Sequence, residues 1–379
     1  MPRLLILTAG YGEGHNTAAR AVQAALREHP GVEADLVDLF DLTAPRLNQL
    51  TRRTYLKLIN TAPRVWNGVY RWLDRPVAGP LLNRTLIAQR RQLARLLAQH
   101  RPDALVSTFP IHGWLLAHLR RQGLATAPLY TVVTDALTIN SLWYRAPSDR
   151  WFVTDPDSAA WLHHAGIRAN DVEVSGFPVA LAFADRPAHL IPPDPARPGQ
   201  PKRILYMINS GRARALETAR ALLARPGWEI TFTAGRDHRL KEELGQLLRA
   251  TPGRGTVLGW TDRIPDLLMT HHLIISKAGG ATTQEAINAL CPMIVNQVVP
   301  GQEEGNYELL RRHDAGTLAE TPEAIVAAVE RAFADDAAVW HRWHGNLARL
   351  AHPSAARTIA RRVLAGCTPP VPQRVAAGT

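Results

Sequence analysis

The sequence predicts an α/β protein made of two Rossmann-like halves, each a doubly wound parallel sheet, that face each other across a cleft. The chain has 379 residues, 46% of them hydrophobic, which is enough for two domains of ordinary size. In both halves short apolar runs alternate with stretches of helical periodicity, and such alternation is typical of parallel sheets with helices on both faces. A stretch with six prolines, residues 185–202, separates the two series of strands.

Apolar runs of strand length recur along the chain. In the first half they cover residues 4–8, 32–36, 104–107, 129–133, 151–153 and 172–174. In the second half they cover residues 203–208, 229–234, 255–258, 273–276 and 293–296. Helices are expected at residues 17–28, 212–224, 240–249, 283–290 and 323–334. Ligands of such sheets bind at the carboxyl ends of the strands, so the cleft is expected there.

The proline-rich stretch sets the expected domain boundaries. We expect an N-terminal domain at residues 1–185, a linker at 186–202 and a C-terminal domain at 203–338. Residues 339–365 have helical periodicity and are expected to pack back towards the N-terminal domain. Residues 366–379, rich in Pro, Ala and Gly, are expected to form a disordered tail.

Positive charge is concentrated in one segment. The chain has a formal charge of +11, and residues 46–101 alone contain twelve Lys or Arg against one acid, Asp74. This segment also carries aromatic and aliphatic side chains among its bases, notably Arg52, Arg53, Tyr55, Lys57, Trp66 and Trp72. The mixture is typical of a segment lying in the interface of an anionic membrane. A solvated basic helix with one core face is the alternative, and no recognised nucleic-acid-binding module accompanies the charge, so no nucleic-acid partner is expected.

Composition restricts the compartment. No run of about 18 apolar residues predicts a transmembrane helix. Cys291 and Cys367 are the only cysteines, which excludes a disulfide framework and fits a reducing cytosol. We therefore expect a cytoplasmic protein associated peripherally with the inner face of the cell membrane.

A glycine-rich turn, Gly10-Tyr11-Gly12-Glu13-Gly14-His15, lies between the first expected strand and the first expected helix. Its spacing differs from the G-x-G-x-x-G dinucleotide fingerprint, and no acid ends the expected second strand at residues 32–36. Such a turn lets a substrate approach the backbone and helix N–H groups, with His15 directed into the cleft. The alternative is a compact turn with a histidine at a helix start.

The strongest motif is Ser276-Lys277-Ala278-Gly279-Gly280-Ala281-Thr282-Thr283-Gln284-Glu285. A strand ends, two glycines follow, and a helix begins, which is a geometry that binds a diphosphate through backbone donors and the helix dipole without a metal. Glu285 has two interpretations. It could accept both hydroxyls of a nucleotide ribose, or it could complete a capping box with Thr282.

Weaker motifs lie elsewhere. Asn209-Ser210-Gly211 is a second candidate phosphate-facing turn, and Pro300-Gly301-Gln302-Glu303-Glu304-Gly305-Asn306 could present amide and carboxylate groups to sugar hydroxyls. Taken alone, the first is typical of a plain turn and the second of a polar helix start. Asp155-Pro156-Asp157 has the D-x-D form of metal-using transferases, but Asp155 fits a helix N-cap better. No metal site is predicted.

These motifs together resemble the monogalactosyldiacylglycerol synthase and processive diacylglycerol glucosyltransferase family, in glycosyltransferase family 28. The resemblance runs over about residues 1–365. It is carried by Gly12-Glu13-Gly14-His15-Asn16-Thr17-Ala18, Val133-Thr134-Asp135 followed by Trp143, Gly176-Phe177-Pro178-Val179, Gly259-Trp260-Thr261, Ser276-Lys277-Ala278-Gly279-Gly280, residues 283–289, and Pro300-Gly301-Gln302-Glu303-Glu304-Gly305-Asn306.

The resemblance implies a GT-B fold and an inverting transfer of a hexose from a UDP-sugar to a diacylglycerol-type lipid, with no cofactor. It implies an N-terminal domain for the acceptor and the membrane, with His15 as general base, Asp135 as a second acid/base or orienting group, and Gly14 near the acceptor. It implies a C-terminal domain for the donor, whose binding residues would be Asn209, Ser210, Gly211, Gly259, Trp260, Ser276, Gly279, Gly280, Thr282, Glu285, Gln302 and Glu303.

The sequence departs from the family in two places, and two other functions stay open. Many relatives have a His between the Thr-Asp pair and the Trp, where this chain has Asn140, and the turn at Asn209 has fewer glycines. Both departures concern substrate identity more than reaction class. A UDP-N-acetylglucosamine 2-epimerase would use the same fold but leave the basic aromatic segment unexplained. A non-catalytic nucleotide-sugar or glycolipid binding protein would need Glu285 but no base.

Overall fold

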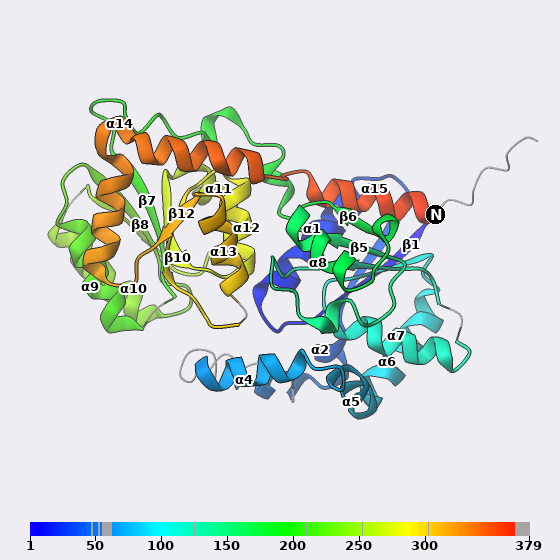
Figure 1. The fold of residues 1–379 in the computed structure, drawn as a ribbon. Helices are drawn as coiled ribbons and strands as arrows, with labels where there is room; N and C mark the ends of the chain where they lie inside the picture. The colour runs from blue at the N-terminus through cyan, green and yellow to red at the C-terminus, as the bar shows by residue number, and fades with distance from the viewer. Residues whose placement is uncertain are drawn as a thin grey trace, which may run out of the picture.

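The computed structural model describes residues 1–46, 48–51, 54, 63–124, 126–209, 211–251, 253–301 and 303–367. Of residues 63, 64, 66, 67, 70 and 83 it describes the backbone alone. The chain forms two α/β units, each built on a six-stranded parallel sheet (Figure 1). The predicted fold class is therefore confirmed.

The sheet of the N-terminal unit has the order β2-β1-β3-β4-β5-β6. Its strands are β1 (Arg3–Thr8), β2 (Glu33–Asp38), β3 (Ala104–Ser107), β4 (Leu129–Val132), β5 (Arg150–Val153) and β6 (Val172–Val174). The central strands are buried on both faces, as their continuous apolar runs predict. The strand order reverses between β1 and β3, so the ligand-binding switch point of this sheet lies there.

Helices cover both faces of this sheet. The apolar sides of α1 (Glu13–Arg27) and α15 (Ala355–Cys367) pack on one face. On the other face lie α2 (Leu39–Thr43), α6 (Ile87–His100) and α7 (Ile111–Arg121). The remaining elements of the unit are α4 (Pro63–Leu73), α5 (Ala78–Thr85), α8 (Pro156–His164), η1 (Ser141–Trp143), η2 (Ala169–Asp171), η3 (Leu181–Phe183) and η4 (Ala188–Leu190).

The sheet of the C-terminal unit has the order β12-β11-β10-β7-β8-β9, with its switch point between β7 and β10. Its strands are β7 (Lys202–Met207), β8 (Trp228–Thr233), β9 (Gly255–Leu258), β10 (Leu273–Lys277), β11 (Met293–Gln297) and β12 (Gly316–Leu318). The apolar runs of the sequence predict the first five strands but not β12. This three-residue edge strand is half-exposed and begins with glycine, so it has no apolar run to reveal it.

The helices of the C-terminal unit also form two layers. One face is covered by α9 (Arg212–Leu223), α10 (His238–Ala250) and the first half of α14 (Pro322–Leu350). The other carries α11 (Ile264–Thr270), α12 (Gly280–Asn288) and α13 (Glu304–Arg312). This second core continues into the N-terminal unit through Ala18, Ala136, Leu137, Phe177 and Val179, so the two units share apolar packing.

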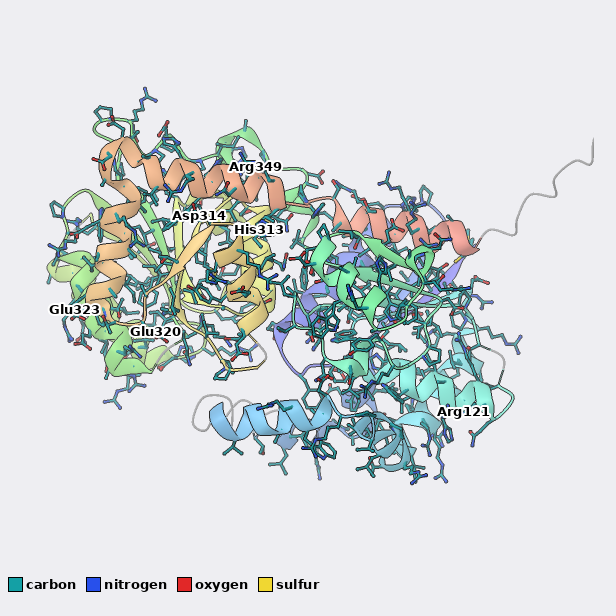
Figure 2. All side chains as sticks on the ribbon, in the orientation of Figure 1. Arg121, His313, Asp314, Glu320, Glu323 and Arg349 are labelled. Atoms are coloured by element: carbon teal, nitrogen blue, oxygen red, sulfur yellow. The ribbon has the colours of Figure 1, made fainter. Side chains whose placement is uncertain are left out.

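The chain returns to the N-terminal unit after α14. This helix breaks at residues 334–337, where the backbone is not helical. Asp314, which lies beneath α14 in Figure 2, holds its second half by accepting from Arg342 Nε at 2.6 Å and from Trp343 Nε1 at 3.0 Å. Then α15 packs on α1, and Arg357 bonds both Glu28 and Asp185. Residues 366 and 367, which were expected to belong to a disordered tail, instead form the end of α15, and residues 368–379 lie outside the described ranges.

Candidate active site

The starts of α1 and α12 face each other where the two units meet. A β-carbon added to Gly14 would lie 3.9 Å from the backbone N of Ala281, and one added to Gly280 would lie 3.9 Å from the carbonyl O of Thr134. Each helix follows a central strand next to the switch point of its sheet. The structure thus brings together two glycine-rich turns that lie more than 260 residues apart in the sequence.

His15 lies in the first turn of α1, at the carboxyl ends of β3 and β4. Its Nδ1 is 2.9 Å from Thr134 Oγ1, and its ring packs edge-on against Phe109 with centroids 5.1 Å apart. Burial lowers the pKa of His15 to about 4, although a hydrogen bond with the backbone of Thr108 opposes this shift. The imidazole is therefore neutral near pH 7 and can accept a proton.

Asp135 follows Thr134 on the same loop. Its Oδ2 accepts a hydrogen bond of 2.9 Å from Nε1 of Trp143, and the Trp143 ring lies 6.0 Å from that of His15. Asn140, where many relatives have His, is buried and caps η1 by accepting from Leu142 N. The two predicted catalytic residues therefore share one aromatic wall, and Asn140 has a structural task beside it.

The turn before α1 corrects one expectation. Gly12 is the N-cap of α1 with φ of 111°, a conformation that suits glycine. The second strand was expected to end at residue 36 without an acid, but β2 extends to Asp38. The Asp38 carboxylate accepts a hydrogen bond of 2.8 Å from Gly10 N and also caps α2. The expected strand ended too early because it was defined by its apolar residues, whereas β2 ends in the polar residue Asp38.

The nest at the start of α12 has the predicted form, but the capping-box interpretation is wrong. The helix begins at Gly280 with Gly279 as its N-cap, and no side chain caps it. Thr282 is thus inside the first turn and Glu285 in the second, so the two cannot form the box. The backbone N–H groups of the first turn point out of the helix towards the cleft, where an anion could bind them.

Glu285 faces the other unit. It is half-buried between α12 and α1, and burial raises its pKa to about 7, with Arg20 lowering the pKa and Glu13 raising it. The attraction of Arg20 therefore offsets only part of the cost of burying the charged form. A carboxylate held this way is ready for a ligand that offers hydroxyl donors.

We expect uridine to bind more tightly as the pH rises from 6 to 8. The Glu285 carboxyl, with a pKa of about 7, holds its proton at pH 6, whereas accepting two ribose hydroxyls favours the ionised form. Uridine has no phosphate to titrate in this range, so calorimetry of uridine isolates the effect. Glu285→Ala should weaken uridine and UDP at least tenfold at pH 8, because the loss of a charged hydrogen bond costs about 1.5–3 kcal/mol.

The same replacement removes a buried acid that is costly to ionise. Relative to Glu285→Gln, the parent should lose stability as the pH rises from about 4.5 to about 7, because Glu285 releases its proton in the unfolded state at a lower pH than in the folded state. The difference in unfolding free energy between the parent and Glu285→Gln, measured across this range, isolates the contribution of Glu285 from that of the buried histidines. If affinity is insensitive to both pH and Glu285→Ala, this side chain does not contact the ribose.

Asn209 and Ser276 connect the two central strands of the C-terminal sheet. Asn209 Nδ2 donates to Ser276 Oγ at 2.7 Å and to the Met207 carbonyl at 3.1 Å. Ser276 is fully buried, so its side chain supports the turn rather than facing the cleft. The prediction that the Ser276 side chain contacts the diphosphate is therefore corrected: this side chain positions the turn by accepting a hydrogen bond from Asn209. Ser210 lies outside the described residues.

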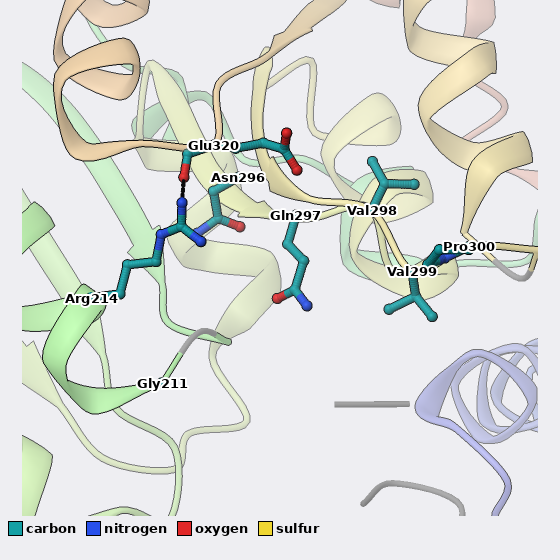
Figure 3. A pocket seen from close by; sticks show the side chains of 8 residues that line it. All are labelled: Gly211, Arg214, Asn296, Gln297, Val298, Val299, Pro300 and Glu320. Atoms are coloured by element: carbon teal, nitrogen blue, oxygen red, sulfur yellow. Dashed lines mark hydrogen bonds between the residues drawn. The ribbon is translucent and has the colours of Figure 1, made fainter. Parts of the chain in front are cut away.

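A hollow of about 370 Å³ opens beside Gly211, the N-cap of α9. Its lining residues are Gly211, Arg214, Asn296, Gln297, Val298, Val299, Pro300 and Glu320 (Figure 3). Arg214 donates to the Glu320 carbonyl, and Oδ1 of buried Asn296 has no hydrogen-bond partner among the described residues. The hollow thus offers a helix N-terminus and a free polar acceptor next to a predicted donor-binding turn.

The last predicted donor residues are distributed around these strands. Glu303 is buried, and its two carboxylate oxygens accept hydrogen bonds from Lys277 Nζ at 2.6 Å and from Val299 N at 3.1 Å. Gln302 lies outside the described residues. Trp260 follows β9 and is 66% exposed, with the Arg236 guanidinium over its ring at 5.9 Å. Gly259 adjoins Gly235, where a flat ring could approach the backbone.

Three residues of the site were absent from the predicted set. Thr134 contacts His15, Phe109 packs against it, and Lys277 pairs with Glu303 beside the nest. Each stands directly after a central strand or inside a quoted motif, and that position is the signal that could have identified them.

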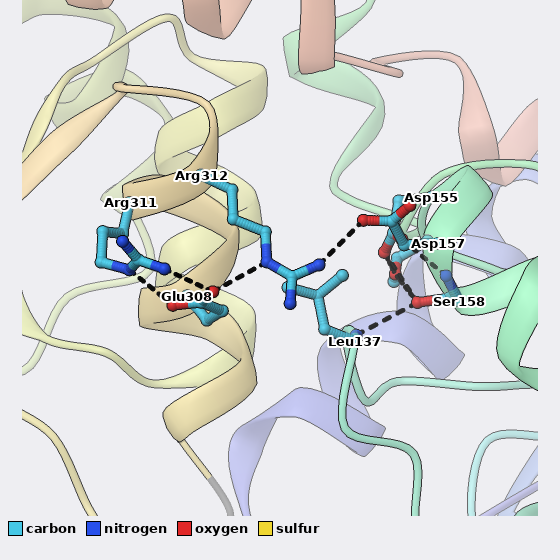
Figure 4. A network of polar contacts seen from close by, with 8 residues as sticks. Leu137, Asp155, Asp157, Ser158, Glu308, Arg311 and Arg312 are labelled. Atoms are coloured by element: carbon cyan, nitrogen blue, oxygen red, sulfur yellow. Dashed lines mark hydrogen bonds and ion pairs between the residues drawn. The ribbon is translucent and has the colours of Figure 1, made fainter.

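The D-x-D motif has structural tasks. Asp155 caps α8 by accepting from Ser158 N at 2.8 Å, as the N-cap interpretation predicted. Asp157 pairs with Arg312 of α13 at 3.2 Å and thereby joins the two units (Figure 4). Among the described residues no cluster of three His, Cys, Asp or Glu side chains is placed to hold a metal ion.

From residue 63 onwards, the basic segment forms α4, α5 and α6 on the N-terminal unit. Arg52, Arg53, Tyr55 and Lys57 lie outside the described residues, as does the side chain of Trp66. Trp72, at the end of α4, is 38% exposed. Across the described ranges, no helix combines the length and the apolar character needed to cross a bilayer.

Comparison with known proteins gives relatives that cover most of the chain. Residues 15–179 match the family model of monogalactosyldiacylglycerol (MGDG) synthase. The processive diacylglycerol beta-glucosyltransferase of Bacillus cereus (strain AH187) is 26% identical over 342 residues, covering 88% of this chain and 86% of the relative. That of Bacillus cereus (strain B4264) is 27% identical over 343 residues, with the same coverage of both chains.

Solved structures share the fold. MurG of Acinetobacter baumannii aligns with a TM-score of 0.63 at 16% identity, over 96% of this chain and 100% of that one. UDP-GlcNAc 2-epimerase from Neisseria meningitidis aligns with a TM-score of 0.60 at 14% identity, over 97% and 99%. These likenesses concern architecture alone. Residues 15–179 thus match the monogalactosyldiacylglycerol synthase family model, most of the chain is similar to the processive diacylglycerol glucosyltransferases, and the architecture is the GT-B fold.

Proposed function

We propose that the protein is an inverting glycosyltransferase that moves a hexose from a UDP-sugar to a diacylglycerol-type lipid in glycolipid synthesis. The observation that carries this is the placement of a neutral histidine, His15, opposite the nest at the start of α12. A base on one unit and an anion site on the other suit a direct displacement. The curated relatives are named for the same reaction class.

In the proposed reaction the lipid hydroxyl attacks C1 of the sugar while the bond from C1 to the phosphate oxygen breaks. The proton of the hydroxyl passes to His15, and UDP leaves with the bonding electron pair. Thr134 and Phe109 hold the imidazole, and Asp135 orients the loop through Trp143. The N–H groups of α12 and its dipole stabilise the diphosphate, so no metal or cofactor is needed.

Incubation of the protein with UDP-hexoses and a lipid extract, in excess chelator, tests the proposal. A new glycolipid together with released UDP is the expected result. Conversion of the nucleotide sugar without any glycolipid would support the epimerase alternative, to which the fold of the Neisseria enzyme gives some weight. Bound but unreacted nucleotide would indicate a binding protein, and strict dependence on manganese would contradict the metal-free mechanism.

We propose further that the protein works on the cytoplasmic face of the membrane, docked through α4 and α5. Large apolar side chains are unusually exposed in this part of the chain. They are Leu42, Leu50, Val65, Val69, Trp72, Val77, Leu81 and Ile87. Exposed bases such as Arg71, Arg75 and Arg84 accompany them. Apolar groups in the acyl boundary and bases at anionic headgroups would hold the acceptor side of the cleft at the bilayer.

Replacement of Arg71, Arg75 and Arg84 by Gln should weaken binding to anionic vesicles. Each base near an anionic surface contributes about 1 kcal/mol, so the loss of three should reduce partitioning by about 10²-fold at physiological salt. The control replaces three exposed bases of the C-terminal unit, Arg220, Arg239 and Arg249, and gives the same net charge. Sedimentation with anionic and neutral vesicles provides the measurement. Equal losses in both variants would mean that the docking surface lies elsewhere.

A further inference from the structure

Lys277 and Glu303 form an ion pair beside the nest of α12. The Lys277 Nζ lies 2.6 Å from Glu303 Oε1, and the Glu303 side chain is 8% exposed while that of Lys277 is 31% exposed. A β-carbon on Gly279 would lie 3.7 Å from Lys277 Cε and 3.8 Å from Glu303 Oε1. The pair is thus in contact with the glycine that caps the anion-binding helix.

A bulge in the sheet places the lysine there. The pairing of β10 with β11 runs from Ser276 opposite Val295 to Lys277 opposite Gln297, which leaves Asn296 unmatched. Such bulges bend a strand and redirect the side chain at its end. The next turn is tight, because Gly279 N donates to the Lys277 carbonyl at 2.8 Å. Strand and turn together hold the Lys277 side chain at the carboxyl edge of the sheet.

The partnership leaves the ammonium group with unused donors. Glu303 has a second contact, since its Oε2 accepts from Val299 N at 3.1 Å. An ammonium has three N–H donors and Glu303 accepts from one of them, while the Lys277 side chain is more exposed than the carboxylate with which it pairs. A partly buried ion pair contributes little net stability by itself, so stability alone does not account for this arrangement.

We propose that Lys277 contacts the diphosphate of the nucleotide sugar and stabilises the charge that UDP acquires as it leaves. Glu303 is its positioning residue. The inference rests on the proposed function and adds a side-chain cation to the backbone donors of α12. As the bond from C1 to the phosphate oxygen breaks, the electron pair stays with UDP. Lys277 keeps its proton throughout, because the proton of the acceptor goes to His15.

The test compares Lys277→Met with Lys202→Met in the full-length protein. Lys202 begins β7, at the opposite edge of the sheet from the strand ends, so it offers the same chemical change away from the site. Calorimetry with UDP and with uridine gives two affinities. We expect Lys277→Met to weaken UDP by about tenfold or more and uridine hardly at all, because only UDP carries the diphosphate. Turnover should fall by about 10²–10³-fold, as for the loss of one preorganised donor.

Two further variants separate contact from folding. Lys277→Arg should recover part of the UDP affinity because it keeps the charge. The double variant Lys277→Met/Glu303→Gln removes the carboxylate that the single change leaves unpaired, and it should still bind UDP weakly. Equal weakening of UDP and uridine, or unchanged UDP affinity and turnover, would overturn the role of Lys277. A parent protein that binds no UDP would instead overturn the proposed function.

Discussion

His15→Ala should lower kcat by about 10²–10⁴-fold, the usual contribution of a positioned general base, while UDP affinity stays nearly unchanged. The separation is expected because His15 belongs to α1, whereas the proposed UDP-binding residues belong to the other unit. His163→Ala, a change at an exposed position of α8, is the matched control. Steady-state kinetics and calorimetry give the two quantities, and undiminished turnover would remove His15 from the mechanism.

The pH dependence adds a second test of the same residue. Burial lowers the pKa of His15 to about 4, so the base stays neutral from pH 5 upwards and is lost by protonation only near pH 4. The acid limb of kcat/KM between pH 6 and 8 should therefore come from Glu285, whose pKa is raised to about 7 by burial. Glu285→Gln should remove that limb while leaving any limb near pH 4 in place.

Gly305→Ala should reduce kcat by about 10²-fold, because a displacement of about 1 Å between reacting groups has that effect. An added β-carbon would overlap the Ala136 carbonyl O and would lie 2.7 Å from Thr138 Oγ1, both on the N-terminal unit. The first is a backbone atom that cannot rotate away. The two units would therefore be unable to approach as closely as they do here, and His15 would be held away from the donor.

Gly345→Ala is the matched control, since a β-carbon there meets nothing within 4 Å and the residue is helical. We expect this change to be neutral or slightly stabilising. In Gly305→Ala, UDP binding should persist, because the nest and Glu285 remain intact. Small-angle scattering should show a wider separation of the units. Full activity with unchanged scattering would contradict the proposed contact.

The sequence predicted the architecture well because periodicity is a local property. Continuous apolar runs such as that of β1 are set by burial on both faces of a parallel sheet, and the glycine turns punctuate them. Prediction failed where neighbours along the chain gave the wrong signal. Thr282 and Glu285 have the spacing of a capping box, but α12 begins at Gly280. Thr282 therefore lies inside the helix, and no capping box forms.

The site was predicted less completely, because its details depend on contacts between distant segments. The ion pair of Lys277 and Glu303 spans 26 positions and needs a bulge that the sequence does not reveal. The raised pKa of Glu285 comes from its burial against α1, which exists only when the two units are together. Motifs could identify Glu285 as a functional candidate, but not its protonation.

The return of α15 to the N-terminal unit determines the order in which the chain can be completed during synthesis. Ala356, Ile359, Ala360 and Val363 cover the same apolar face as α1, about 180 residues after the last strand of that sheet has been made. During synthesis, the part of the N-terminal sheet that α15 covers therefore stays exposed until α15 has been made. The C-terminal unit is contiguous from β7 through α14, so its sheet needs no later helix to cover it. The C-terminal unit, although it is synthesised second, can thus complete its folding first. The N-terminal unit can complete its folding only after α15 has been synthesised.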